Sequence, residues 1–290
     1  MTINRYYYKA LEPVHAGAGG FRLGRVDKTI QREPGTQLPK VAGTSISGAA
    51  RAYAALAIQS PESAGQAKYD AKKHAKCPVF FTFGHANDAE GGNAGQVAVG
   101  DAHILFFPVA SMKGMTFITS VDVLENAGIQ LENAPTQNQF GVNFGIDESD
   151  FNLAWLWVQK REQVRVSLPN FPNALNFLEK KRIVIVPERM LTALVNSQLE
   201  VRTSVSISPI TGTAEGTALF VYEAIPRFTI LTQEVVVDAY RDGGKVPDNK
   251  KNWKGPLEVL EHGLTMIGTF GVGGMGNKGF GRMELIRGGA

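Results

Sequence analysis

The sequence predicts an α+β fold for this chain of 290 residues. Short runs rich in β-branched and aromatic residues, which favour strands, occur along the whole chain together with a few helix-forming segments. The two types do not alternate as regular strand–helix pairs, so the pattern differs from that of a parallel α/β sheet. Hydrophobic residues make up 43% of the chain, enough for a large core, and we expect one domain over residues 1–290.

Helices are predicted where strong helix formers follow a capping residue or a proline. The clearest case is the alanine-rich segment 45–58, for which Thr44 or Ser45 is the expected N-cap. Pro187 and Pro256 stand at further predicted starts, because proline suits the first helical position. The predicted helices cover residues 45–58, 121–126, 187–196 and 256–264.

Strands are predicted where short runs of β-branched and aromatic residues lie between turn residues. Two of these runs, 199–209 and 218–224, flank a polar, glycine-containing stretch, and this spacing predicts a long hairpin. The predicted strands cover 6–14, 97–99, 103–108, 115–120, 151–157, 164–166, 182–186, 199–209, 218–224, 228–237 and 282–286.

Polar stretches with proline and glycine separate these elements and indicate insertions into the domain. The last glycine-rich stretch contains a G-x-G-x-x-G pattern at 271–276, but a strand rather than a helix is predicted after it, which argues against dinucleotide binding. A structural turn and a backbone-amide cradle for phosphate both stay open for this loop. The candidate insertions are 60–95, 127–150, 203–219 and 240–255.

Composition narrows the class of protein. The chain carries 30 basic and 27 acidic residues, so binding to a nucleic acid has to come from local clusters of charge. Cys77 is the only cysteine, which excludes an intramolecular disulfide and a cysteine-based zinc site. The N-terminus has no apolar signal core and no run of about 18 apolar residues occurs, so we expect a cytoplasmic protein without a membrane segment.

Several aromatic side chains in the middle of the chain have two interpretations. Alternating aromatics in strands are most often core residues, and we expect that role here. Stacking on nucleic-acid bases is the alternative. The residues concerned are Phe140, Phe144, Trp155, Trp157 and Phe177.

Residues 15–51 form the most informative stretch of the chain. Within it, Asp27 is a solitary acid among four cations, Arg22, Arg25, Lys28 and Arg32. Cations without a matching acid cluster indicate an anionic partner, most simply a phosphate backbone. The turn at 43–48, Gly-Thr-Ser-Ile-Ser-Gly, precedes a helix and offers free N–H groups to a phosphate. A lone carboxylate beside such a surface suits a catalytic base or a metal ligand.

This stretch resembles the backbone subunit of type III-B CRISPR effector complexes, a member of the RAMP superfamily. The matching pieces are His15-x-Gly17-x-Gly19, Val26-Asp27-x-x-Ile30-Gln31-Arg32 and Pro39-x-x-x-Gly43-Thr44-Ser45-Ile46-Ser47-Gly48-x-x-Arg51. Later pieces follow in the family's order and cover most of the chain. They include Pro108-Val109-x-Ser111-x-Lys113-Gly114, Phe220-x-x-Glu223-x-x-Pro226 and the last glycine-rich loop.

The resemblance implies a ferredoxin-like, RNA-recognition-like core with long insertions, among them a thumb-like hairpin at 203–219. It also implies a repeated subunit that stacks with copies of itself, and with other subunits of the complex, along a guide (CRISPR) RNA. The subunit would cleave the paired single-stranded target RNA. In the family the aspartate at the position of Asp27 is the cleavage residue, so Asp27 is the expected catalytic residue and metal ligand, with Mg²⁺ or Mn²⁺ as cofactor.

The resemblance and the local cations together indicate a set of RNA-binding residues. Two departures from the family weaken it, because Ser47 stands where the family has a lysine and Ala110 where it often has an arginine. The expected RNA-binding residues are His15, Arg25, Arg32, Thr44, Ser45, Ser47, Arg51, Ser111, Lys113, Gly273, Gly274, Met275, Asn277 and Lys278.

Two other interpretations stay open. The first is a structural subunit of the same architecture that binds guide RNA without cleaving target. The second is a guide-precursor processing endonuclease of the same superfamily, in which His15 acts as acid and base. A histidine before a glycine-rich loop is more often a hydrogen-bonded structural residue. The Asp27 motif also argues against the second interpretation.

Overall fold

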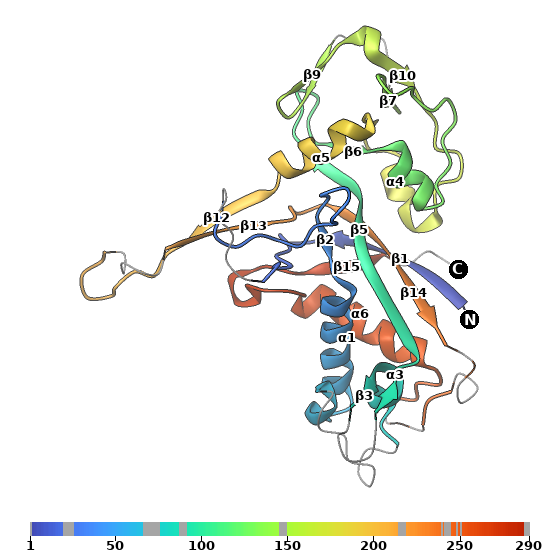
Figure 1. Ribbon diagram of the computed structural model, residues 1–290, viewed down its shortest axis with the longest axis vertical. Coiled ribbons are helices and arrows are strands. Elements are labelled where there is room, and N and C mark those ends of the chain that lie inside the picture. The colour runs from blue at the N-terminus through green and yellow to red at the C-terminus, as the bar shows by residue number, and fades with distance from the viewer. Residues whose placement is uncertain are drawn as a thin grey trace.

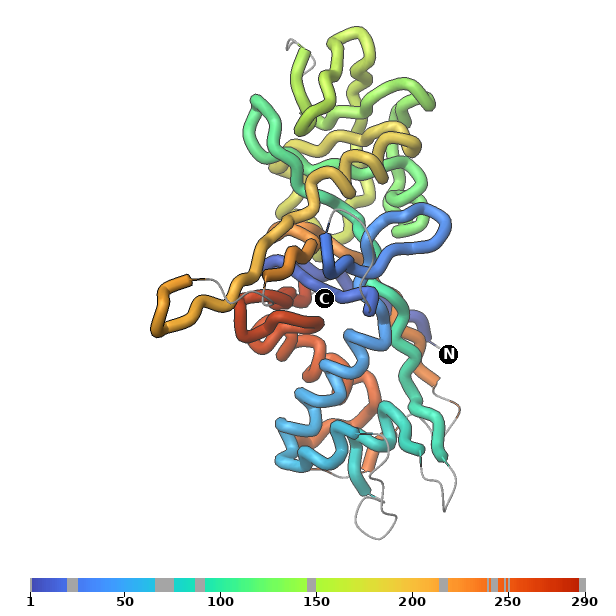
Figure 2. The backbone as a smooth tube through the Cα atoms, turned by 60° about the vertical axis from the view of Figure 1, so that its left-hand side comes forward, coloured from blue at the N-terminus to red at the C-terminus, as the bar shows by residue number. Residues whose placement is uncertain are grey.

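The computed structural model shows an elongated molecule (Figures 1 and 2). Strand β5 (Val97–Val109) runs between its two ends and links a lower part, which contains the long helices, to an upper part (Figure 1). The structure describes residues 2–19, 26–65, 76–86, 92–144, 150–213, 219–238, 240, 245–247, 249 and 251–286.

The centre of the molecule is an antiparallel sheet covered by two helices that pack against each other. Strand β1 pairs with β14 and β15, and β14 pairs with β5. The order β-α-β-β-α-β along the chain is that of the ferredoxin-like motif, and the predicted α+β class is confirmed. Besides β5, these elements are β1 (Thr2–Ala10), α1 (Gly43–Ala57), β14 (Ile230–Val237), α6 (Pro256–Phe270) and β15 (Met283–Ile286).

The same sheet continues into the upper part, where its strands are short and partly parallel. Its order there is β10-β7-β11-β6-β5, and β2 pairs separately with β5. The added strands are β2 (Lys40–Val41), β6 (Thr116–Thr119), β7 (Phe140–Val142), β10 (Gln163–Arg165) and β11 (Ile183–Ile185).

Short helices and two-stranded ribbons complete the described residues. Helices α4 and α5 cover the upper part and α3 lies beside α1 at the lower end (Figure 1). The helices are α3 (Pro78–Phe83), α4 (Val121–Asn126) and α5 (Glu188–Ser197). The ribbon strands are β3 (Gly84–His85), β4 (Asn93–Ala94), β8 (Phe151–Leu153), β9 (Leu156–Val158), β12 (Glu200–Ser204) and β13 (Phe220–Ala224). Single 3₁₀ turns are η1 (Pro61–Ala64), η2 (Lys160–Glu162), η3 (Asn173–Leu178) and η5 (Gly276–Lys278).

The two long helices cross at unusually short range. A Cβ on Gly263 of α6 would lie 2.2 Å from the carbonyl oxygen of Ala50 in α1, so no larger residue fits without moving a helix. At the start of α1, a Cβ on Gly43 would lie 2.2 Å from the Val99 carbonyl oxygen of β5. These two glycines therefore fix α1 between the sheet and α6.

The structure corrects several sequence expectations. Residues 97–99 and 103–108 belong to one long strand, β5, which continues through Gly100 and Asp101 although its pairing with β14 shifts register there. Part of the expected insertion 127–150 is strand β7, whose three residues are buried inside the sheet. Helix α3 was not expected, since its six residues are too few to show a helical period. Parts of all four expected insertions lie outside the described residues: 66–75, 87–91, 145–149, 214–218, 241–244, 248 and 250.

We predict that Gly263→Ala destabilises the fold by about 1–3 kcal/mol, the usual range for overpacking. The matched control is Gly48→Ala on the exposed side of α1, where a Cβ meets nothing within 4 Å. That change should be neutral or stabilise by about 0.5–1 kcal/mol, because alanine favours a helix more than glycine does. Chemical denaturation measures both. Equal midpoints for the two variants would contradict the close helix crossing.

Candidate nucleic-acid interface

Strands β12 and β13 form the predicted hairpin, which projects from the side of the molecule (Figure 1). The segment that carries Asp27 lies against the first residues of β13. The backbone N–H of Asp27 donates to the Val221 carbonyl at 2.9 Å, and Asp27 Oδ2 accepts the Val221 N–H at 2.7 Å. Asp27 is exposed, so its second carboxylate oxygen faces solvent at the root of the hairpin.

A buried carboxylate, Glu223, holds this segment in place. Its two oxygens accept both Nη atoms of Arg32 at 2.6 and 2.9 Å, and Oε1 also accepts the backbone N–H of Ile30 at 2.9 Å. Arg32 Nε donates to Asn196 Oδ1 of α5 at 2.9 Å. Arg32 is thus an ion-paired structural residue. The expectation that the cations of residues 15–51 have no acidic partner is therefore wrong for Arg32.

His15 joins the same network from the other side. It is only 5% exposed, and its Nδ1 lies 2.7 Å from the Glu223 carbonyl oxygen. Its own carbonyl accepts the N–H of Gly274 at 2.9 Å, and a Cβ on Gly273 would lie 2.5 Å from that carbonyl. This burial favours a structural role over the acid–base role of the processing-endonuclease interpretation.

The last glycine-rich loop therefore packs on His15 and presents its far end to solvent. Gly273 and Met275 both have left-handed φ, 84° and 65°. Asn277 and Lys278 are exposed at the far end. Lys278 Nζ donates to Ser204 Oγ of β12 at 2.6 Å, so the loop reaches across to the hairpin.

The loop and the first turns of α1 enclose a groove of about 360 Å³. Thr44 and Ser45 line it from the helix, and residues 271–273 and Gly276 line it from the loop. These predicted phosphate-binding segments, remote in sequence, are therefore brought together. Ser47 is partly buried on the same helix but does not line the groove.

The start of α1 is not capped in the way the sequence suggests. The N-cap is Ala42, with no side-chain cap, so the expectation of Thr44 or Ser45 is wrong. Instead, Asp101 of β5 accepts the Gly43 N–H at 2.8 Å and pairs with Lys40 at 2.5 Å. Burial raises the pKa of Asp101, but these two donors outweigh it and leave the pKa below its ordinary value. Thr44 and Ser45 thus keep their hydroxyls for the groove.

Arg51 does not face this groove. It is 4% exposed, and its Nε and Nη2 donate to the carbonyls of Ser63 at 2.8 Å and Gly65 at 3.0 Å. Its guanidinium also lies 5.3 Å from the ring of Phe80, and burial lowers its pKa. A phosphate contact by Arg51 would require these hydrogen bonds to break. Arg51 is therefore not part of the proposed RNA-binding site.

Two further expected contacts lie elsewhere. Ser111 and Lys113 form the turn between β5 and β6, in which Ser111 Oγ donates to the Gly114 carbonyl at 2.7 Å. Strand β2, which follows the Asp27 segment, pairs with β5 at His103. The turn that carries Ser111 and Lys113 lies about 25 Å from His103, measured along an extended strand. Arg25 lies outside the described residues.

Sequence reasoning named Lys28 and Lys278 but missed the aromatic rings and Arg202 at the hairpin root. Lys28 Nζ lies 4.2 Å and Lys278 Nζ 5.2 Å from the ring centre of Phe220. Arg202 lies 4.7 Å from the ring of Phe280. The available signal was weak, because it consists of a lysine beside Asp27 and an aromatic residue at the start of a strand.

The aromatic residues expected in the core divide into two groups. Phe140 is buried and Phe144 is partly buried against the main core, as expected. Trp155 and Trp157 of the β8–β9 ribbon are 61% and 53% exposed, and Phe177 is 39% exposed, so the core expectation is wrong for these three. Trp155 Nε1 donates to Ser197 Oγ at 2.8 Å, which fixes that ring beside α5.

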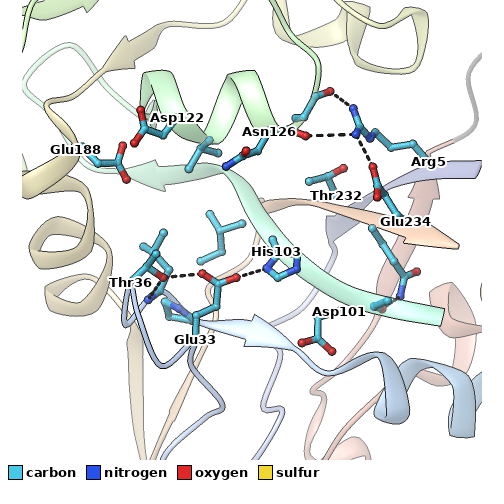
Figure 3. Close-up of a pocket in the computed structure, with 17 residues that line it drawn as sticks. Arg5, Glu33, Thr36, Asp101, His103, Asp122, Asn126, Glu188, Thr232 and Glu234 are labelled. Carbon is cyan, nitrogen blue, oxygen red and sulfur yellow. Dashed lines mark hydrogen bonds and ion pairs between the residues drawn. The ribbon is translucent and has the colours of Figure 1, made fainter. Parts of the chain in front are cut away.

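A cavity of about 480 Å³ lies between β5, β14 and α4 (Figure 3). None of the expected site residues lines it. Its charged side chains include more carboxylates than cations, and His103 pairs with Glu33 at 2.5 Å (Figure 3). An excess of acids disfavours a phosphate backbone here. The acidic lining residues are Glu33, Asp101, Asp122, Glu188 and Glu234.

The expected metal was tested against the residues around Asp27. In the described ranges, no three His, Cys, Asp or Glu side chains come together as a protein-only metal site requires. The neighbouring residues 20–25 contain none of these types in the sequence. Asp27 alone fits a hydrated divalent ion shared with substrate phosphates, which is a common arrangement for Mg²⁺. No helix in the described part of the chain is long and apolar enough to span a membrane.

Comparison with known proteins gives consistent results. The family model described as the RAMP superfamily matches residues 7–284. A curated relative from Pyrococcus furiosus, the CRISPR system Cmr endoribonuclease Cmr4, is 30% identical over 250 residues, which cover 78% of this chain and 79% of the relative.

Solved structures with the same fold include a type III-B Cmr-beta complex bound to cognate target RNA, at a TM-score of 0.68 and 13% identity. That match covers 99% of this chain and 97% of the other. The oligomeric Cmr4 crystal structure from Pyrococcus furiosus matches at a TM-score of 0.60 and 22% identity, covering 99% and 98% of the two chains.

We predict that Glu223→Gln destabilises the protein by about 1.5–3 kcal/mol, because Arg32 loses a charged partner that is largely shielded from water. Glu200→Gln is the matched control, since it removes the Arg202 pair, which is more exposed. That change should cost at most about 1 kcal/mol. Denaturation midpoints and limited proteolysis within 26–41 report both changes. If Glu223→Gln behaves like Glu200→Gln, the network is not what holds the Asp27 segment.

Proposed function

The chain belongs to the RAMP superfamily, and on that premise we propose that it is a repeated backbone subunit of a type III-B CRISPR ribonucleoprotein. In this role, copies stack along one guide RNA together with other subunits, and each cleaves the paired target RNA once. The named activity of the curated relative supports the cleavage, and its identity over most of both chains supports the assembly. We place this complex in the cytoplasm.

The groove between α1 and the glycine-rich loop is the proposed site for guide RNA. Thr44 and Ser45 supply hydroxyls there, beside the start of α1, whose Gly43 N–H is already bonded to Asp101. In the loop, Gly273 and Gly276 would add backbone N–H donors that do not distinguish bases, since the N–H groups of Gly271 and Val272 are bonded within the protein. Such phosphate contacts position a nucleic acid without reading its sequence, which leaves specificity to pairing between guide and target.

One observation carries the proposed cleavage. The Asp27 carboxylate is exposed, yet its orientation is fixed by the Val221 N–H at the root of the hairpin. The hairpin is the proposed thumb, which displaces a target nucleotide from regular A-form geometry. Asp27 then takes the proton of the 2′-hydroxyl, whose oxygen attacks the adjacent phosphorus. The P–O5′ bond breaks, and the products carry a 2′,3′-cyclic phosphate and a 5′-hydroxyl.

We further propose that Asp27 and the target phosphate together hold a divalent ion, Mg²⁺ or Mn²⁺. A bound ion would stabilise negative charge on the phosphate oxygens. Asp27 is suited to share such an ion, because one of its oxygens is bonded to Val221 and the other faces solvent.

We predict that Asp27→Asn lowers target cleavage at least about 10²-fold in the assembled complex, the usual contribution of a positioned base. Asparagine keeps an oxygen for the Val221 N–H, so assembly and target binding should not change. Asp122→Asn, on the exposed face of α4, is the control. Gel analysis of end-labelled target gives rate and positions. If the Asp27→Asn complex cleaves at the wild-type rate, Asp27 is not the catalytic residue. If the wild-type complex leaves the target intact, the interpretation as a non-cleaving subunit is supported.

We also predict that chelation with EDTA stops cleavage while guide RNA stays bound, because the phosphate contacts at the groove need no metal. Adding Mg²⁺ or Mn²⁺ back should restore the cuts at the same positions. Measurement of cleavage rate and retained guide in one sample separates the two effects. Undiminished cleavage after thorough chelation would show that Asp27 acts without a metal.

A further inference from the structure

Two lysines meet at one aromatic ring beside Asp27. Lys28 Nζ lies 4.2 Å from the ring centre of Phe220, and Lys278 Nζ lies 5.2 Å from the same point. Lys28 comes from the N-terminal loop and Lys278 from the last glycine-rich loop, while Phe220 is the first residue of β13. Three segments that are remote in sequence thus converge on one side chain.

These two cations have no acid partner in the described part of the chain, Asp27 included. Lys278 uses one N–H donor on Ser204 Oγ, at 2.6 Å. An ammonium has three donors, so both lysines keep donors for another ligand. Contact with the ring orients the ammonium groups without neutralising them.

Both ammonium groups lie within 5.2 Å of one point, so at most about 10 Å separates them, which is the Debye length at about 0.1 M salt. Screening over this distance is incomplete, and the two charges repel each other. A phosphate within reach of both ammonium groups would relieve the repulsion. This favours an anion site over a purely structural contact.

The position of this pair relative to Asp27 is fixed by the backbone. Lys28 follows Asp27 directly, and its N–H donates to the Val221 carbonyl at 3.1 Å. The Asp27 carboxylate accepts the N–H of Val221, the residue after Phe220. The acid and the two-lysine site are therefore attached to the same end of β13.

We propose that Lys28 and Lys278 bind the scissile phosphate of the target strand, beside the base Asp27; this inference rests on the proposed function. When the 2′-oxygen attacks, negative charge grows on the two non-bridging phosphate oxygens, and the ammonium groups stabilise it. The 2′-hydroxyl proton passes to Asp27, the P–O5′ bond breaks, and the departing 5′-oxygen takes a proton from water. The hydroxide that remains takes the proton from Asp27, so atoms and charge balance without any further reactant.

The test uses the assembled complex with wild-type, Lys28→Gln, Lys278→Gln and Lys28→Arg subunits. Glutamine keeps most of the carbon stem over Phe220 and removes only the charge, and arginine keeps both. Lys251→Gln changes an exposed lysine near Trp253, on a different loop, and is the control. Two readouts are measured: the single-turnover cleavage rate of matched target, and the salt dependence of binding to a target with a 2′-deoxy nucleotide at the cut site.

Each glutamine variant should lower the cleavage rate at least about 10-fold, since one preorganised donor often contributes that much or more. Each should also reduce the dependence of target binding on salt. The slope of the logarithm of the binding constant against the logarithm of salt concentration should fall by about 0.7, the value for one lost phosphate contact to single-stranded RNA. Lys28→Arg should restore both. If wild type cleaves and both glutamine variants match Lys251→Gln in rate and slope, the two-lysine site is overturned. If wild type binds guide and target but never cleaves, the proposed function fails first.

Discussion

The buried Glu223 carboxylate is the contact on which the arrangement of the interface depends. It pairs with Arg32 at 2.6 Å and accepts the Ile30 N–H, while its backbone carbonyl lies 2.7 Å from His15 Nδ1. A single residue of β13 thus connects the Asp27 segment, the glycine-rich loop on His15, and the hairpin. Because a charge shielded from water is costly when unpaired, the network favours one position for all three.

The glycine-rich loop has two sides with different roles. Its first residues line the groove with Thr44 and Ser45, and their conformation depends on glycine, since a Cβ on Gly273 would meet the His15 carbonyl at 2.5 Å. Its far end carries Lys278 to β12 and Phe220. One short segment therefore lies between the proposed guide groove and the proposed cleavage site.

The sequence predicted local features well and long-range pairs poorly. Most of α1, which is rich in strong helix formers, and the short helix α4, which follows the capping residue Ser120, appear where expected, because their signals lie within a few neighbouring residues. The Arg32–Glu223 pair spans 191 positions, and nothing in a single sequence links two such residues. Arg51 and His15 were assigned to RNA because of their motif positions, and only burial in the tertiary structure indicates a structural role.

For Asp27 the structure supports a functional role that composition alone does not predict. Composition alone makes a solitary exposed aspartate an ordinary surface residue, and only the family resemblance gave it a role. The structure adds a physical reason to consider it, because an exposed carboxylate is normally free to rotate, whereas this one is held by the Val221 N–H at 2.7 Å. A base works best when its orientation is fixed before the substrate arrives. Fixing one oxygen to a strand edge while leaving the other in solvent meets that requirement at little cost to the core.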